Sequence, residues 1–562
     1  MARIGIALDV GTSCYKAQKI DLDTQEVMGT AMTLHNPLPG ANAIDQRAFA
    51  AKWPQMSHEL CIMAVKRLIV GLGVYPYELE RMAICGNAVQ VSIFLGLTID
   101  DLLSEAAGAP DSCGTVDRGA RILDAADIDG LKKYSPCHIV VPPAARNRIG
   151  ADKLALVMYS GLLEGEDSAL AMDFGIGTKV ALKVGGVVYT GSVASGTGLG
   201  GQGLSYGTVA KPQSVCDFRW EDDNLRAMVL DDGMHVTVGD LFDPLTGTMI
   251  EQGQVKPFSI AGSGSVSLIS AGMERGLIVP PRIRTASGSI DMRVDLRYDE
   301  ADLALTGIAI GKVRAACRAL TVLAGIEADA IHHVYTSGAI GTYADPDKAK
   351  TVGLLPDSTT HVTQIGNTSL QLARELVNNP GRAFELEAIA DSVPWHWVAF
   401  ERLPTYVRAL ECEHAFWEDG ISPEGMASMC AARGIPKPNP RAGTPLKVTT
   451  LDRDIPEMGK GGLKIRNMVD TCLHIKVEGC TGCFCCTDIC KNNAIKPDTK
   501  VIHIRTDLCS GLGCQKCQMT CSTGVINWDR IELGRYEDET KWMPAKWKHT
   551  QNKVWASSPT NE

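Results

Sequence analysis

Alternating apolar and polar or small residues at the start of the chain predict a β-hairpin. Ile4, Ile6 and Leu8 alternate with smaller residues and predict one strand, and Tyr15–Ile20 predicts the next. Between them, Asp9–Cys14 is rich in residues that favour turns. The pattern therefore places a short polar loop at the end of a buried strand.

The same pattern returns later in the chain. Ala169–Met172 predicts a strand, Asp173–Thr178 a second glycine-containing loop, and Val180–Val184 the strand that follows it. Asp173 lies 164 residues after Asp9. Two strand–loop–strand units at this separation predict a duplicated pair of α/β domains.

Longer stretches of helical periodicity complete the α/β pattern. Apolar residues at helix spacing predict a helix over 47–72 and a longer one over Asp302–Ile326. His333–Thr336 predicts a buried strand, and Ser337–Gly341 predicts a loop at its end. Residues 99–150 are rich in Asp, Gly and Pro, and they predict an elaborated loop or a small subdomain.

Charge and hydropathy restrict the possible partners. The chain has 562 residues, with 55 Lys and Arg against 65 Asp and Glu, which gives a net charge of −10. This acidity argues against a general nucleic-acid binder, whose surface is basic. No signal-peptide pattern is visible, and the longest uncharged stretch, Val184–Ala210, has too many turn-forming residues for a membrane span. We therefore expect a cytoplasmic protein with neither a nucleic-acid nor a membrane partner.

Cysteine is the unusual residue of this chain. There are 19 cysteines, and ten of them lie between Cys472 and Cys521. A disulfide scaffold would be short and secreted, and this chain does not fit that description. The cluster therefore predicts metal ligation in a reducing compartment.

Eight of these cysteines form two runs with iron–sulfur spacing. The first has the x2-x2-x3 spacing of bacterial ferredoxins, and the second has x4-x2-x3. A zinc ribbon would use paired CxxC units with one tetrahedral site per four cysteines, and two complete runs fit it poorly. In two-cluster ferredoxins the fourth cysteine of each run ligates the other cluster. The predicted ligands of two [4Fe–4S] clusters are therefore Cys480, Cys483, Cys486 and Cys521 for one, and Cys509, Cys514, Cys517 and Cys490 for the other.

The runs depart from the ferredoxin pattern in two ways. Lys491 and Ser522 stand where a proline usually follows the fourth cysteine. The second run has four residues after its first cysteine, so that this loop must bulge. Cys472 and Cys485 are not predicted to be ligands, although Cys485 competes with its neighbour Cys486. Four histidines show no ligand spacing relative to the runs and are interpreted as structural or surface residues: His35, His58, His474 and His503.

The two glycine-containing loops have the composition of a phosphate site. Gly11 lets the backbone approach a phosphate, and the hydroxyls of Thr12 and Ser13 donate hydrogen bonds to it. Asp9, at the strand end, holds Mg²⁺ through water. Each loop alone is more often an ordinary turn, but the loops in this order predict ATP binding. The other predicted residues are Asp173, Gly175, Gly177 and Thr178, which repeat this chemistry, and Gly338 and Gly341, which are placed to contact adenosine.

Some features remain open. Lys16 and Lys179 follow the two loops and are interpreted as solvated, although either side chain reaches far enough for a phosphate. The glycine-rich segments Gly196–Gly203 and Gly262–Ser265 are equally consistent with turns and with binding loops. Four tryptophans near the end of the chain dock a partner or, as we favour, pack on a neighbouring domain: Trp528, Trp542, Trp547 and Trp555.

This arrangement resembles the superfamily of actin, heat-shock chaperone ATPases and sugar kinases. The resemblance implies an α/β fold with a duplicated ATPase core, to which a small α+β ferredoxin-like domain with two [4Fe–4S] clusters is joined. Residues 434–446 have the proline-rich composition of a linker. The predicted divisions are 1–165 and 166–345 for the two halves of the ATPase, 346–433 for an α/β extension, 434–464 for the linker, 465–527 for the ferredoxin-like domain and 528–562 for a Trp-rich tail.

An actin-like ATPase joined to a two-cluster ferredoxin resembles the reductive activators of corrinoid proteins. Within them, the chain is most similar to the methylamine methyltransferase corrinoid protein reductive activases of methanogenic archaea, which carry the ferredoxin domain at the C-terminus. The segments that carry the resemblance are Leu8–Ser13, His35–Asn42, Ile84–Asn87, Ala171–Lys179, Ile260–Ser270 and Leu303–Gly341.

The resemblance implies an enzyme that uses ATP to reduce inactive Co(II) to Co(I) in corrinoid proteins of methylamine methyltransferase systems. Asp9 and Asp173 would organise Mg²⁺, and the cluster cysteines would carry an electron from a low-potential donor. An activator of another enzyme, such as a radical dehydratase, is an alternative within redox chemistry. Plain ferredoxin-type electron carriage and a zinc-ribbon sugar kinase are alternatives from other classes, and ATP hydrolysis and iron content discriminate among them.

Overall fold

A computed structural model describes residues 3–103, 114–165, 168–436, 445–466, 471–498 and 500–535. The first lobe is built on a seven-stranded sheet in the order β24-β3-β2-β1-β4-β6-β5. β1 to β3 form an antiparallel meander, and β4 and β6 continue the sheet in parallel. The strands are β1 (Ile4–Val10), β2 (Tyr15–Asp21), β3 (Val27–Thr33), β4 (Leu79–Gly86), β5 (Arg121–Asp124), β6 (His138–Val141) and β24 (Leu463–Arg466).

The second lobe repeats this topology. Its seven strands follow the order β22-β9-β8-β7-β20-β21-β23, again with an antiparallel meander next to parallel strands. The predicted duplication of the α/β unit is confirmed, since β7 and β8 surround the second loop as β1 and β2 surround the first. The strands are β7 (Ala169–Asp173), β8 (Thr178–Val184), β9 (Val187–Val193), β20 (His333–Ser337), β21 (His361–Ile365), β22 (Trp395–Val398) and β23 (Lys447–Asp452).

Helices cover the sheets and fill the space between the lobes. The helix predicted over 47–72 is two helices, because Trp53 leaves the helical conformation and Pro54 starts the second at its first turn. The long predicted helix is confirmed as α8 (Glu300–Ala324), which an Asp299 capping box begins and Gly325 ends. Other helices are α1 (Ala43–Lys52), α2 (Pro54–Gly71), α3 (Ala88–Phe94), α5 (Ala151–Tyr159), α7 (Gly262–Glu274), α9 (Gly338–Tyr343), α11 (Thr368–Asn378), α12 (Arg382–Ser392), α13 (Pro404–Trp417) and α14 (Pro423–Ala432).

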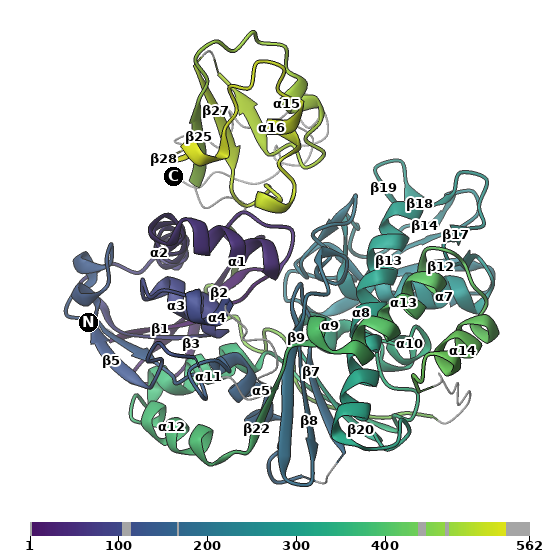
Figure 1. Ribbon diagram of the computed structural model, residues 1–562, viewed down its shortest axis with the longest axis horizontal. Helices are drawn as coiled ribbons and strands as arrows, with labels where there is room; N and C mark the ends of the chain where they lie inside the picture. The colour runs from purple at the N-terminus through teal and green to yellow at the C-terminus, as the bar shows by residue number, and fades with distance from the viewer. Residues whose placement is uncertain are drawn as a thin grey trace.

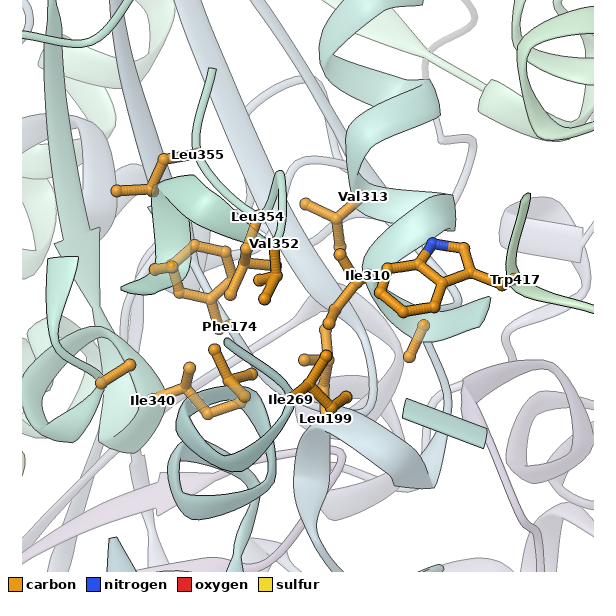
Figure 2. Close-up of a cluster of buried hydrophobic side chains, with 14 of the residues drawn as sticks. Phe174, Leu199, Ile269, Ile310, Val313, Ile340, Val352, Leu354, Leu355 and Trp417 are labelled. Carbon is orange, nitrogen blue, oxygen red and sulfur yellow. The ribbon is translucent and has the colours of Figure 1, made fainter. Parts of the chain in front are cut away.

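The core of the second lobe supports the loops that face the first. Figure 2 shows Ile310 and Val313 of α8 with Trp417 of α13 in one buried cluster, together with Phe174, Leu199 and Ile340. Phe174 belongs to the second glycine-containing loop. Burial of such side chains stabilises by roughly 1.5–3 kcal/mol each, so the loop rests on a rigid base. A six-stranded mixed sheet is inserted in this lobe, with β10 (Gly207–Thr208), β11 (Ser214–Glu221), β12 (Asn224–Leu230), β13 (Val236–Phe242), β14 (Met249–Glu251) and β15 (Ser259–Ala261).

Two segments predicted as loop or linker contain strands of the main sheets. Residues 99–150 include β5 and β6, so the expectation of a loop or small subdomain holds only around them. The predicted linker 434–464 contains β23, which pairs with β21, and reaches β24, which pairs with β3. The chain thus adds one parallel edge strand to each lobe before it leaves the ATPase core; residues 437–444 lie outside the described part.

Residues 471–535, called the ferredoxin-like module below, form a separate small α+β unit. Its sheet has the order β26-β27-β25-β28, and the unit lies over α1 and α2 of the first lobe (Figure 1). Because β28 pairs with β25, the unit extends past the predicted boundary at residue 527. Trp528 is buried within it, whereas Trp542, Trp547 and Trp555 lie outside the described residues. The elements are β25 (Thr471–Lys476), α15 (Cys485–Asp488), β26 (Ile495–Pro497), β27 (Val501–Arg505), α16 (Lys516–Thr520) and β28 (Glu532–Arg535).

Among the helices in the described ranges, none is both long and apolar enough to cross a bilayer.

Candidate nucleotide cleft and cysteine module

The two glycine-containing loops face each other across a cleft between the lobes, called the nucleotide cleft below. The space between the loops, together with the open solvent at its mouth, is about 830 Å³. Strands β1 and β7 deliver Asp9 and Asp173 to it at their carboxyl ends. The backbone N–H of Ile176 donates to Oγ of Ser13 at 3.2 Å, so the two loops touch.

Most of the predicted binding residues line the nucleotide cleft, and two do not. Thr178 is fully buried, and its Oγ1 lies 2.9 Å from Oγ of Ser195, so it stabilises the second loop from behind. The carbonyl of Gly341 accepts hydrogen bonds from Thr336 and Gln364. Direct ligand contact by either residue is therefore not supported. The predicted residues that do line the cleft are Asp9, Gly11, Thr12, Ser13, Asp173, Gly175, Gly177 and Gly338.

Gly338 shows why this wall needs glycine. Its φ is +78°, and a β-carbon there would lie 2.5 Å from Oδ1 of Asp173. Any larger residue would push the carboxylate out of place. The loop predicted over Ser337–Gly341 is instead the end of β20 and the start of α9. The first residue of α9 therefore brings its backbone directly against the acidic side chain of β7.

Asp9 and Asp173 have different surroundings. The amide of Asn367 donates to Oδ2 of Asp9 at 3.0 Å. Burial raises the pKa of Asp9 to about 6, against the opposing effect of the Lys16 ammonium. Asp173 forms a direct ion pair with Lys179. The carboxylate of Asp173 is thus paired with a lysine, whereas the site of Asp9 disfavours the charged form of its carboxylate.

The interpretation of both lysines as solvated is wrong. Lys16 is buried, with its ammonium 2.7 Å from both carboxylate oxygens of Asp454. Lys179 contacts Asp173 and lies 3.5 Å from Oδ2 of Asp152. Burial acts to lower the pKa of Lys179, but the Asp173 and Asp152 carboxylates outweigh it and raise that pKa. Both lysines line the nucleotide cleft as charged groups.

Sequence reasoning missed several residues of the cleft. Asn367 caps α11 and reaches Asp9, and the strand–Gly–Asn pattern before a helix was the available signal. Asp454 lies in the predicted linker and carried no signal. Of the two glycine-rich segments left open, both contribute: Gly200 and Gly262 line the cleft. Ser263 also lines it, and its buried hydroxyl has no protein partner, which fits a hydrogen bond to a ligand.

The ferredoxin-like module brings cysteines of both runs together. Burial raises the pKa of Cys509, and the neighbouring sulfurs of Cys517, Cys490 and Cys514 raise it further. Cys490 of the first run thus lies within electrostatic range of Cys509 of the second, which is compatible with the shared-ligand pattern of two-cluster ferredoxins. Such mutual proximity of thiols suits a cluster that takes up thiolates.

Backbone N–H groups point at sulfurs of both runs. Gly482 donates to Sγ of Cys480 at 3.5 Å, and Gly511 donates to Sγ of Cys509 at 3.4 Å. Such N–H···S contacts tune the potential of iron–sulfur clusters, and so the donor set fits these groups. Cys480 and Cys483 are exposed, whereas Cys517 is buried.

Comparison with known proteins identifies the family. A family model described as the C-terminal domain of RACo, the ASKHA domain, matches residues 167–427. The Co(II) methylated amine-specific corrinoid protein reductase of Methanosarcina barkeri is 34% identical over 500 residues, which cover 88% of this chain and 92% of the relative.

The chain belongs to this reductase family. A second relative of this chain, the corrinoid activation enzyme RamQ of Eubacterium limosum, is 21% identical over 391 residues, with 63% of this chain and 60% of RamQ covered. A solved structure of a reductive activator for a corrinoid, iron–sulfur protein superposes with a TM-score of 0.58 at 21% identity, over 73% of this chain and 66% of that one. This likeness shows a shared fold, and it agrees with the predicted actin and sugar-kinase-like core.

Proposed function

We propose that this reductase uses ATP to reduce Co(II) to Co(I) in corrinoid proteins of methylamine methyltransferase systems. The observation that carries the proposal is the match to the Methanosarcina reductase, which covers 88% of this chain and 92% of that protein. Its partner is then a corrinoid protein, and its reaction sustains methyl transfer from methylamines in methanogenesis.

The nucleotide cleft would hold Mg·ATP. Gly11, Thr12 and Ser13 on one side would hold the phosphates, with Gly175 and Gly177 opposite. The carboxylates of Asp9 and Asp173 would organise Mg²⁺, which prefers oxygen ligands and retains water. Asp9 suits this role because a bound cation would offset the cost of its buried charge.

The ferredoxin-like module would hold two [4Fe–4S] clusters. We assign Cys490, Cys509, Cys514 and Cys517 to one cluster, on the spacing of the two runs. The second cluster would take Cys480, Cys483, Cys486 and Cys521. Such clusters pass one electron at a time from a low-potential donor to the corrinoid. We infer that the enzyme works in the cytoplasm, where cysteine thiols stay reduced.

ATP is needed because the electron moves uphill. A one-electron step costs about 1.4 kcal/mol for each 59 mV by which the acceptor's potential lies below the donor's. Co(I) is a very strong reductant, and so an ordinary cluster does not populate it unaided. ATP would drive a conformational change that is transmitted to the cobalt. This change would supply the free energy of the uphill electron transfer as a shift in populations.

The test uses anaerobic protein with its iron content measured. Reductant and a Co(II) corrinoid methyltransferase partner are mixed with the enzyme, with and without ATP, and the Co(I) absorption band is followed. Co(I) is expected only with ATP, and Asp9→Asn combined with Asp173→Asn should abolish it while iron content stays full. Co(I) without ATP would favour a plain electron carrier; ATP hydrolysis without Co(I) would favour an activator of another enzyme.

A further inference from the structure

Three potential metal ligands meet on the sheet of the ferredoxin-like module, away from the predicted cluster cysteines. Cys472 and His474 lie on β25, and His503 lies opposite His474 on β27. Each residue offers one ligand atom, and these three atoms all lie within 4.8 Å of one another. Side chains alternate along a strand, so Leu473 and Ile475 point to the other face. These belong to the same core as Cys486 and Cys517.

The contacts of His474 indicate a cation between these residues. Its Nε2 lies 3.0 Å from Sγ of Cys472 and 3.0 Å from Nδ1 of His503. A ring nitrogen carries one hydrogen or offers one lone pair, so it satisfies one of the two neighbours well. Around a tetrahedral zinc ion, bond lengths near 2.0–2.3 Å place neighbouring ligand atoms about 3.4–3.6 Å apart. The three atoms need to separate only slightly to admit such an ion.

The backbone also makes room for this arrangement. Gly534 of β28 faces Cys472 in register, and a β-carbon there would lie 2.1 Å from Cε1 of His474. The imidazole therefore occupies space that any other residue would fill. The rings of His474 and His503 lie edge to face, with 4.6 Å between their centroids, so that the edge of one ring points at the face of the other.

We propose that Cys472, His474 and His503 form a zinc site, separate from the iron–sulfur clusters, with its fourth position open to water. One thiolate and two imidazoles are a ligand set that zinc prefers. On binding, the Cys472 thiol releases its proton and forms the Zn–S bond, and no electron is transferred. The ion would join β25 to β27 at the point where the chain enters the module.

The test measures zinc in the full chain with its clusters intact. Anaerobic protein is dialysed against Zn²⁺, freed of excess metal and analysed for zinc and iron, and the zinc environment is measured by X-ray absorption at the Zn edge. We expect about one zinc per chain without loss of iron, bound by one sulfur and two imidazole nitrogens. Cys472→Ser and Gly534→Ala should weaken zinc binding at least about tenfold. His235→Ala, at an exposed hairpin, should leave it unchanged.

Two results would overturn the zinc site. One is protein with full iron that retains no zinc; the other is zinc surrounded by four sulfurs, which would place it in a cluster position. Should Cys472→Ser lose iron and fail to fold, the absorption spectrum of the natural protein still decides, because it needs no variant.

A different set of contacts links the nucleotide cleft to the cluster held by Cys509. The extra residues of the second cysteine run, Ser510–Gly513, rest against the loop after β3. The N–H of Gly40 donates to the carbonyl of Cys509 at 2.8 Å. A β-carbon on Gly511 would lie 3.1 Å from the carbonyl oxygen of Pro39. The bulge that departs from the ferredoxin pattern is therefore one of the parts of the module that pack on the ATPase.

The same loop holds the first phosphate loop at its other end. The amide of Asn36 donates to the carbonyl of Gly11 at 2.9 Å, and the amide of Gln46 donates to the carbonyl of Thr12 at 3.1 Å. Gln202 of the second lobe donates to the carbonyl of Ser13 at 3.0 Å. Residues 36–46, which comprise the loop after β3 and the first turn of α1 and are called the bridging loop, thus contact both the phosphate loop and a cluster ligand.

We infer that the bridging loop transmits the nucleotide state of the cleft to the cluster held by Cys509; this rests on the proposed function. Movement of the phosphate loop would shift the bridging loop through Asn36 and Gln46 and alter the surroundings of the Cys509 sulfur. Hydrogen bonding and solvent exposure around a cluster set its potential, so the shift is expected to appear as a nucleotide-dependent potential.

The test compares glycines of the two cluster loops. Gly511 and Gly482 both have positive φ, +68° and +67°, but nothing lies within 4 Å of a β-carbon on Gly482. The cluster potential is measured by EPR titration with ADP and with a non-hydrolysable ATP analogue. In the natural protein we expect the potential to depend on the nucleotide. Gly511→Ala should lose at least half of that dependence while ATP hydrolysis persists, and Gly482→Ala should keep it.

The outcomes separate this inference from the proposed function. Absence of ATP-dependent Co(I) in the natural protein would count against the function itself. ATP-dependent Co(I) with a potential that ignores the nucleotide would overturn the bridging loop's role alone. Equal loss in Gly511→Ala and Gly482→Ala would also overturn it, because strain in a glycine loop would then explain the effect.

Discussion

At the scale of residues, the two aspartates of the nucleotide cleft are equivalent in sequence and different in setting. Each ends a strand before a glycine-containing loop. Asp173 is paired with Lys179, whereas Asp9 accepts a hydrogen bond from Asn367 and lies near a lysine that Asp454 already binds. A buried carboxylate without a close cation is costly, and proteins retain such groups where a ligand supplies the charge. Asp9 is therefore the residue at which a cation would gain most.

We predict that Asp9→Asn stabilises the nucleotide-free protein. Because the folded-state pKa of Asp9 is raised from 3.8 to about 6, folding favours the protonated acid. The destabilisation is absent well below pH 4, grows as the pH rises toward 6 and is complete above it, where it reaches about 3 kcal/mol. Asparagine carries no charge and avoids it. Chemical denaturation without nucleotide should show a gain at pH 8 that falls to about half at pH 5.

Asp173→Asn is the matched comparison. It breaks a buried ion pair and leaves Lys179 with Asp152, so we expect a loss of about 2 kcal/mol. If Asp9→Asn also destabilises the protein at pH 8, Asp9 is a structural residue and the interpretation above is wrong. The sequence predicted both aspartates as site residues but not this difference, because the partners Asn367 and Asp454 lie more than 300 positions from Asp9.

At the scale of elements, the strands and loops with local signals were predictable. The two strand–loop–strand units follow from alternation and turn residues within about ten positions. Strands β23 and β24 were not predictable from local signals, because each pairs in parallel with a strand far away in the sequence. Parallel pairing leaves no hairpin signal. The nearby prolines and glycines have the composition of a connector, and that composition hid the strands.

We predict that the ATPase core needs the segment up to Arg466. A chain that ends at residue 446 lacks β23, β24 and Asp454, which leaves two sheet edges open and the buried Lys16 without its carboxylate. An unpaired buried charge costs about 3–5 kcal/mol, so this chain should aggregate or lose ATP binding. A chain that ends at residue 466 should fold and bind ATP.

Circular dichroism, gel filtration and nucleotide titration of the two shortened chains check this prediction. Lys16→Met in the full chain isolates the ion pair from the strands. Equal folding of the chains ending at 446 and 466 would show that the segment is a connector after all, as its composition indicates.

At the scale of the whole molecule, the ferredoxin-like module presents its two cysteine sets differently. The set with Cys509 packs against the first lobe, where Lys52 and Asp529 form an ion pair at 2.5 Å and Trp53 lies 6.5 Å from Trp528 between ring centroids. Trp528 thus packs on a neighbouring part of the chain, as favoured for the tail. Cys480 and Cys483 are exposed, and Figure 1 shows α15, which follows them, on the side of the module away from α2.

This asymmetry predicts two distinct reduction potentials. Adding an electron increases the negative charge of a cluster, which water stabilises and a buried site does not. The cluster held by Cys480 and Cys483 should therefore be reduced first, and the cluster held by Cys509 and Cys517 at a potential lower by at least about 60 mV, a tenfold difference in a one-electron equilibrium. The more buried cluster then delivers the lower-potential electron, next to the lobe that binds ATP. An EPR redox titration resolves the two steps; Cys483→Ser should alter the first and Cys514→Ser the second. Coincident steps, or the reverse assignment, would mean that local hydrogen bonds outweigh exposure in setting these potentials.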